Sequence, residues 1–307
     1  MEQVISVVKT VLPVFVALGL GMLCRSRKLL SREGIDGLKK VVLDITLPAV
    51  LLNAFATTEY TLATISIPFV VFLLCCFALG LGMVGIRLSG KKSRVSPFIA
   101  SGFEAGMLGY ALFAVAFPQE SSSRFAILDL GQTIFVFTLY KLLLSGKGSG
   151  KAVIRDMVKS PILWAVFAGV LLGATGLYDL MTQTGISAVF HGVADFVAAP
   201  TGMVILLTVG YDLVPREIPW KKVGGLIALR LAVMAICLTV LLVLNRWVLG
   251  NVVFTGAALL MFLLPPPYVI PVFADEPAER VEISAALSAL TLVSLILFTV
   301  LCVFIGI

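Results

Sequence analysis

The sequence predicts an all-α integral membrane protein in which ten transmembrane helices form an inverted repeat of five plus five. The first observation is composition: 60% of the 307 residues are hydrophobic, 13% are charged, and the mean hydropathy is +1.09. Soluble domains carry about 25% charged residues, so a water-soluble protein is excluded. The second observation is a series of apolar runs long enough to cross a bilayer. The third is that two of these runs, at corresponding places in the two halves, are interrupted.

The spans follow in order from runs of roughly 20 apolar residues between short polar loops. In the first half we place them at about 4–24, 37–57, 62–88, 96–117 and 123–144. In the second half we place them at about 161–178, 186–211, 222–248, 252–274 and 281–306. Residues 145–160 begin with Ser, Gly and Lys in alternation, which is typical of a flexible polar linker. The predicted organisation is therefore a repeat over 1–144, a cytoplasmic linker over 145–160 and a second repeat over 161–307.

Five is an odd number, so the second repeat must enter the membrane from the opposite side to the first. Weak internal similarity supports this relation, because prolines and glycines fall at similar places in matching spans. The matched features are Pro13 with Gly19 and Gly21, Pro161 with Gly169 and Gly173, Leu47-Pro48-Ala49, and Ala199-Pro200-Thr201.

The orientation follows from the distribution of positive charge in short loops. Of the 23 lysines and arginines, 19 lie in or beside the odd-numbered loops. We therefore expect these basic loops in the cytoplasm and both termini outside, in the inner or plasma membrane. The charges are spread between apolar runs and form no single basic face, so no nucleic-acid partner is expected.

The two interrupted spans are the fourth and the ninth. The segment Ser101–Gly109 carries three glycines and a carboxylate, and Leu264–Pro271 carries four prolines. Unwound backbone at membrane depth is tolerated only where it is buried in protein or lines a watery cavity. A matched pair of such breaks points to the midplane binding site of a secondary transporter. We expect the substrate to contact residues in both breaks and on two neighbouring spans, namely Glu104, Ala105, Gly106, Met107, Gly109, Pro266, Pro267, Tyr268, Pro271, Asn53 and Gln132.

Charged residues inside the membrane are costly, at about 2.5–3.5 kcal/mol each, and so are candidates for ion coupling. Glu104 is expected either to exchange a proton or to be a neutral structural group. Asp129 is expected either to line the cavity or coordinate a cation with Gln132, or to pair with Arg230. Arg230 alone would extend toward the basic edge. Asp275 either helps to bind sodium or belongs to a solvated loop. A single histidine excludes a multi-histidine metal site, so no cofactor is expected beyond a coupling H⁺ or Na⁺.

Four motifs occur in order along the whole chain: Leu12-Pro13 with the glycines that follow, Leu47–Leu52, Gly106–Gly109 and Leu264–Ala274. They resemble the auxin efflux carrier family, whose members include plant PIN auxin exporters and bacterial permeases for malate and malonate. The resemblance implies a bile acid/sodium symporter-like fold. Spans one, two, six and seven would form a scaffold, often dimeric, and spans three to five and eight to ten a mobile transport domain. Substrate, mostly an organic anion, would bind where spans four and nine cross, and that domain would move as an elevator.

Two residues depart from the family pattern. Many members have an asparagine or another neutral polar residue where Glu104 stands, and a proline where Ala111 stands. Glycines can provide the unwinding without that proline. An ionised Glu104 would repel an anion, so either Glu104 is protonated when substrate binds or the substrate is neutral or cationic.

The function expected from these observations is secondary transport of a small organic solute, a carboxylate or other organic anion, coupled to protons through Glu104. The alternative is a sodium-coupled or uncoupled carrier of a neutral or cationic solute. A channel or sensor is disfavoured because channels build their pores from symmetric rings. An intramembrane enzyme is disfavoured because the chain has no DDxxD motif and no histidine cluster. The expected partners are the solute, the bilayer and a second copy of the chain.

Overall fold

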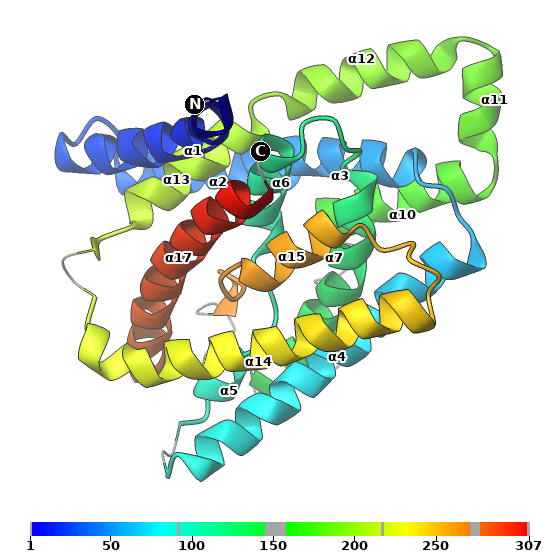
Figure 1. Ribbon diagram of the computed structural model, residues 1–307. Helices are drawn as coiled ribbons and strands as arrows, with labels where there is room; N and C mark the ends of the chain where they lie inside the picture. The colour runs from blue at the N-terminus through cyan, green and yellow to red at the C-terminus, as the bar shows by residue number, and fades with distance from the viewer. Residues whose placement is uncertain (1, 91–92, 145–157, 216–217, 271–276, 306–307) are drawn as a thin grey trace.

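The protein is all-helical in the part of the chain that the computed structural model describes (Figure 1). That part comprises residues 2–90, 93–144, 158–215, 218–270 and 277–305. Six of its helices are long and apolar enough to cross a membrane, and they are Val8–Ser26, Leu62–Leu88, Ser123–Leu144, Ile186–Asp212, Trp220–Trp247 and Glu282–Ile305. A bent pair of helices would make a seventh. The all-α, multi-pass class is confirmed within the described residues, whereas the full count of ten spans stays a prediction.

The first half follows the predicted order of segments. Its elements are α1 (Glu2–Ser26), α2 (Arg32–Val41), η1 (Val42–Thr46), α3 (Leu47–Ala56), α4 (Leu62–Leu88), α5 (Ser96–Ile99), η2 (Ala105–Gly109), α6 (Tyr110–Ala116), α7 (Ser123–Phe135), η3 (Val136–Tyr140) and α8 (Lys141–Leu144). The segment predicted at 37–57 begins earlier, at Arg32, and contains the π-helical turn η1. Pro48 offers no N–H to the carbonyl of Asp44, so the helical hydrogen-bond pattern is disturbed at this point.

The second half contains α10 (Pro161–Ala174), α11 (Leu177–Gln183), α12 (Ile186–Ala198), α13 (Thr201–Asp212), α14 (Trp220–Trp247), α15 (Thr255–Leu263) and α17 (Pro277–Ile305). The prediction of one span over 161–178 needs a correction. The chain turns by 67° between α10 and α11. Gly176 permits this turn, because its φ of +75° lies in the left-handed region that other residues rarely adopt.

Both interrupted spans are broken in the structure, but the first break is shorter than predicted. The sequence predicts an interruption over 101–109, whereas unwound backbone lies only between Ile99 and Ala105. Helical structure resumes at Ala105 because the Glu104 side chain accepts a hydrogen bond from the N–H of Met107 and so caps the new helix. The second break begins where α15 ends, at Leu263, and its described part reaches residue 270. Pro265, Pro266 and Pro267 account for it.

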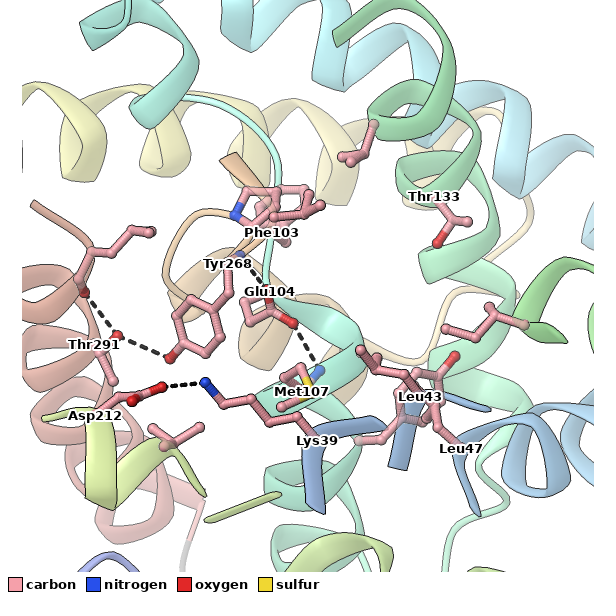
Figure 2. A pocket seen from close by; sticks show the side chains of 18 of the residues that line it. Lys39, Leu43, Leu47, Phe103, Glu104, Met107, Thr133, Asp212, Tyr268 and Thr291 are labelled. Carbon is pink, nitrogen blue, oxygen red and sulfur yellow. Dashed lines mark hydrogen bonds and ion pairs between the residues drawn. The ribbon is translucent and has the colours of Figure 1, made fainter. Parts of the chain in front are cut away.

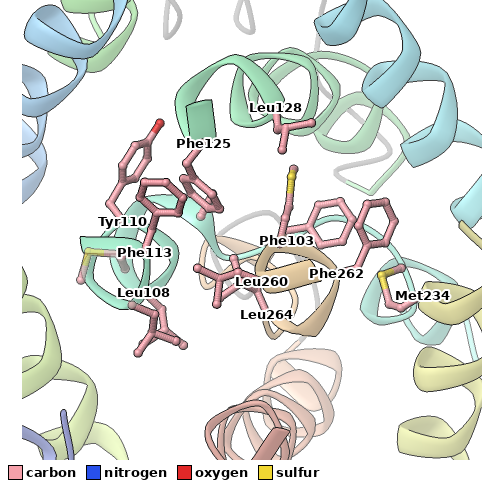
Figure 3. Packing of buried hydrophobic residues seen from close by; sticks show 14 of the residues in the cluster. Phe103, Leu108, Tyr110, Phe113, Phe125, Leu128, Met234, Leu260, Phe262 and Leu264 are labelled. Carbon is pink, nitrogen blue, oxygen red and sulfur yellow. The ribbon is translucent and has the colours of Figure 1, made fainter. Parts of the chain in front are cut away.

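The apolar core surrounds the two breaks. Phe103 packs edge-on against Phe262, with ring centroids 4.9 Å apart, and Tyr110 packs in the same way against Phe125 at 5.0 Å. Figure 3 shows these rings around Leu260, at the centre of the cluster. In Figure 1, α15 lies in the middle of the molecule, with α7, α14 and α17 around it. The second break is therefore held inside protein, as irregular backbone in a membrane must be.

Helices from the two halves pack closely through glycine. A Cβ placed on Gly21 of α1 would lie 2.0 Å from the carbonyl oxygen of Leu207 in α13. In return, a Cβ on Gly210 of α13 would lie 2.1 Å from the carbonyl oxygen of Leu18. Small residues at such positions let membrane helices approach closely, since packing contacts drive helix association in lipid.

We expect the Gly21→Ala substitution to lower the melting temperature of the protein in detergent. Its methyl group has no space beside α13, and overpacking of this kind costs about 1–3 kcal/mol. The matched control is Gly19→Ala in the same helix, where nothing lies within 4 Å of the added atom. Equal melting temperatures for the two variants would show that α1 and α13 do not pack as described.

Candidate functional site

Glu104 joins the two breaks. Its backbone N–H donates to the carbonyl of Pro265 at 2.8 Å. Its side chain accepts hydrogen bonds at both oxygens: Oε1 from the N–H of Met107 at 2.7 Å, and Oε2 from the N–H of Tyr268. Figure 2 shows the carboxylate between Tyr268 and Met107. One buried carboxylate, 7% exposed, thus binds the start of a helix in the first break and the loop of the second.

Close approach of the two backbones depends on Gly102. Its φ of +68° lies in the left-handed region, and a Cβ there would lie 3.1 Å from Cγ of Pro267. A side chain at this position would therefore be strained and crowded. The expectation that the fourth and ninth segments meet at their breaks agrees with these contacts.

Arg230 of α14 is the second group that connects the breaks. Its guanidinium donates to the carbonyls of Ile99, Gly102 and Leu264, each at 2.8 Å, and to that of Ser101 at 3.4 Å. The residue is 2% exposed. Unwinding leaves carbonyls without helical donors, and the planar guanidinium with its several N–H groups supplies them. The prediction that Arg230 pairs with Asp129 is wrong, and so is the prediction that it extends to the basic edge.

Asp129 instead belongs to a polar group on α7. It accepts hydrogen bonds from the Tyr110 hydroxyl at 3.0 Å and from the Thr133 hydroxyl at 3.2 Å. Gln132, on the same helix, donates from Nε2 to the carbonyl of Phe103 at 2.7 Å. Its Oε1 is buried and has no hydrogen-bond partner among the described residues. That oxygen is therefore an acceptor without a partner in the interior of the described part of the protein.

A cavity of about 830 Å³ lies beside the crossing. The residues that line it include members of the first break, the second break, α2 with η1, and α17. Among the residues predicted to bind substrate or ions, those that line it are Glu104, Gly106, Met107, Asp129, Gln132, Pro267 and Tyr268. This volume is in the range of small-molecule sites, which are concave, mostly apolar and carry a few polar groups.

The other predicted residues lie elsewhere. Ala105 and Gly109 are buried in η2, where Gly109 leaves room for the ring of Phe125. Asn53 and Pro266 are not part of the cavity wall, and the Asn53 side chain is 3.4 Å from the carboxylate of Asp195. Pro271 and Asp275 lie outside the described residues. No group of three or more histidine, cysteine or acidic side chains suited to a metal ion occurs among the residues that were described.

Sequence reasoning missed a cluster of charges in the cavity wall. Asp212, at the end of α13, accepts a hydrogen bond from Arg32 at one oxygen and from Lys39 at the other. Both cations come from α2, and all three residues line the cavity. In the sequence, Lys39 and Arg32 are two of the basic residues in or beside the odd-numbered loops, although the spacing of 7 along a helix places them on the same face. That spacing was the available signal.

Comparison with known proteins finds similarity to membrane transporters. A family model described as membrane transport protein matches residues 6–153. The chain is 26% identical over 218 residues to an uncharacterized transporter of Methanothermobacter thermautotrophicus, covering 68% of this chain and 70% of the relative. It is 24% identical over 227 residues to an uncharacterized transporter of Methanocaldococcus jannaschii, covering 71% and 72%.

The match confirms the resemblance that the motifs indicate. It also agrees with the long apolar helices of the structure. Over residues 6–153 the chain is therefore similar to the membrane transport protein family, and it is an integral, multi-pass membrane transporter, not an enzyme.

Proposed function

We propose that the protein is a secondary transporter that binds a small organic solute, a carboxylate by preference, in the cavity beside the crossing breaks. The observation that carries this proposal is the position of Glu104. It lines the cavity, caps η2 and accepts the N–H of Tyr268 from the opposite break. A carboxyl group in this position can contact a bound solute, and a change in its hydrogen bonds also changes the contact between the two breaks.

The same contacts support the proposal of proton coupling. The ionised carboxylate offers an acceptor at each oxygen, and both are used by backbone N–H groups. Protonation turns one oxygen into a hydroxyl, which weakens the hydrogen bond at that oxygen. The link between Glu104 and either Met107 or Tyr268 is then loosened. A proton would thereby change how firmly the two breaks are joined.

Helix packing supports the inverted repeat of ten spans. The most extensive helix contacts are those of α1 with α13 and of α10 with α3. In the predicted numbering these are span one with span seven and span six with span two. In the predicted repeat, span one corresponds to span six and span two to span seven. The two helix pairs are therefore equivalent, as an inverted repeat requires. We propose that these four spans form the scaffold and that the remaining six move as an elevator.

The orientation proposal rests on the helix ends. In Figure 1, α1, α4 and α13 all end on the left, where α2 and α14 begin. Basic residues gather at these ends, among them Arg25, Arg87, Lys221 and Lys222. By the positive-inside rule this end faces the cytoplasm. Arg32 lines the cavity and its side chain is 58% exposed, so the cavity opens toward the same end.

A second candidate function is favoured by the charge of the cavity wall. Its ionisable groups include the carboxyls of Asp44, Glu104, Asp129 and Asp212, against two basic groups, Arg32 and Lys39. With all four carboxyls ionised, the wall would favour a cationic or neutral solute, moved with sodium or without a coupled ion. With Glu104 protonated, the wall loses one of these negative charges and accepts a carboxylate more readily.

Flux into proteoliposomes would decide between these functions. Purified protein is reconstituted, and uptake of radiolabelled malonate, indole-3-acetate and a matched amine is followed with an imposed proton gradient, an imposed sodium gradient and neither. We expect carboxylate flux that saturates and responds to the proton gradient. Amine flux alone, or a response to sodium alone, would favour the second candidate.

A further inference from the structure

We propose that Lys39 binds the carboxylate of the substrate, and that the carboxylate of Asp212 pairs with Lys39 while no substrate is bound. This inference rests on the proposed carboxylate transport and adds the residue that selects for charge.

The first argument is that Asp212 is shared. One of its oxygens binds Arg32 and the other binds Lys39. When the ammonium of Lys39 turns to a ligand, Asp212 keeps Arg32 as its partner. The exchange therefore leaves no charge of the cluster unpaired, and an unpaired charge within a membrane protein is costly.

The second argument separates the two cations. The Lys39 side chain is 24% exposed, whereas that of Arg32 is 58% exposed and also lies 3.4 Å from the carboxylate of Asp36. Arg32 is thus the outer group, tied to carboxylates on two elements. Lys39 is the inner one, and Figure 2 shows its side chain extending through the cavity to reach Asp212.

The third argument is the row of hydroxyl groups in the same cavity. Ser284, Ser288 and Thr291 of α17 all line it, at spacings of 4 and 3 that place them on one helix face. They run from an exposed position at Ser284 to a buried one at Thr291. The Thr291 hydroxyl lies 2.9 Å from that of Tyr268, and both point toward the region of Lys39 in Figure 2. These hydroxyls can bind the second polar group of a hydroxy acid or a dicarboxylic acid.

The remaining basic group near the crossing cannot take this role. The guanidinium of Arg230 is held by four backbone carbonyls and does not line the cavity. Three carboxyl groups on other elements line the same cavity as Lys39, namely those of Asp44 on η1, Glu104 at the first break and Asp129 on α7. An incoming anion must therefore pair with a cation of the cavity wall. Of Arg32 and Lys39, the two basic residues among the described residues of that wall, Lys39 is the inner one.

The test measures ligand-induced thermal stabilisation of the purified full-length protein. The probes are sodium malonate, succinate, benzoate and indole-3-acetate, each beside its uncharged amide at matched ionic strength. The variants are Lys39→Gln, Asp212→Asn and the double variant, with Lys40→Gln as the control. Lys40 is a neighbouring lysine of the same helix that is exposed and does not line the cavity.

The two single variants should act in opposite directions. Lys39→Gln should weaken the apparent affinity for the stabilising carboxylate by about tenfold or more and leave that for the amide unchanged. Asp212→Asn should strengthen carboxylate binding several-fold, because it removes the competing internal anion. Lys40→Gln should leave both affinities as in the wild type.

Four results would overturn the inference. If both single variants lower the melting temperature of the free protein but leave the carboxylate affinity unchanged, the cluster is only a structural ion pair. If Lys39→Gln does not fold, the test rests on Asp212→Asn. Carboxylate binding that is unchanged or weaker in this variant refutes the exchange of Asp212 for substrate at Lys39. If no carboxylate stabilises or crosses with the wild type, the proposed function itself fails and this inference fails with it. Carboxylate transport that survives in Lys39→Gln refutes only the inference.

Discussion

The Arg230→Met variant is expected to lose its folded structure in detergent and all transport. Methionine has similar length but no donor, so the carbonyls of Ile99, Gly102 and Leu264 would each lose a hydrogen bond of 2.8 Å. Each buried carbonyl left without a partner costs about 1–3 kcal/mol. Three such losses amount to a large part of the total stability of about 5–15 kcal/mol that is typical of a protein.

Size-exclusion chromatography and a melting curve would measure this effect. Arg246→Met, at an exposed position of the same helix, is the matched control and should behave as the wild type. Arg230→Lys should be intermediate, because an ammonium keeps the charge but cannot span the carbonyls of both breaks with a planar fork. A folded, active Arg230→Met variant would contradict the role assigned to the guanidinium.

The Glu104→Gln variant is expected to lose the pH dependence of transport. The amide oxygen can accept the N–H of Met107 or that of Tyr268 but not both, and its NH₂ group faces the other donor. The side chain also no longer exchanges a proton, so the strength of the contact between the breaks becomes independent of pH. Solute flux in proteoliposomes, recorded at several pH values, measures the change.

The Asp129→Asn variant distinguishes the role of Asp129 from that of Glu104, the other buried carboxyl group of the cavity. Asp129 contacts Tyr110 and Thr133, and neither residue belongs to the second break. Its replacement should alter the rate but keep the response to pH. If the response persists in Glu104→Gln and disappears in Asp129→Asn, the coupling group is Asp129 and the mechanism given for Glu104 is wrong.

The positions of the two breaks could be predicted from sequence because their causes are local. Glycine and proline change what the backbone can do at their own positions, so a cluster of either marks an interruption wherever the chain folds. The length of the first break could not be predicted in this way. It depends on the Glu104 side chain, which caps Met107 and restarts the helix at Ala105.

The partners of Arg230 and Lys39 could not be predicted, because they are distant in the chain and no sequence pattern links them to these residues. Arg230 binds backbone carbonyls up to 131 residues away, and any residue type supplies a carbonyl. Lys39 binds Asp212 over a separation of 173 residues. In sequence alone, Lys39 is one more positive charge beside a membrane span. Only the packing of α2 against α13 gives it a specific partner.

The hydrogen bonds of Arg230 also have a consequence for how the chain enters the membrane during synthesis. The first half is made before Arg230 and Pro265 leave the ribosome, since proteins are synthesised from the N-terminus. Until then, the carbonyls of Ile99 and Gly102 and the N–H of Glu104 lack the partners that they have in the finished protein. The hydrogen bonds of this stretch are therefore complete only after the second half of the chain has been made.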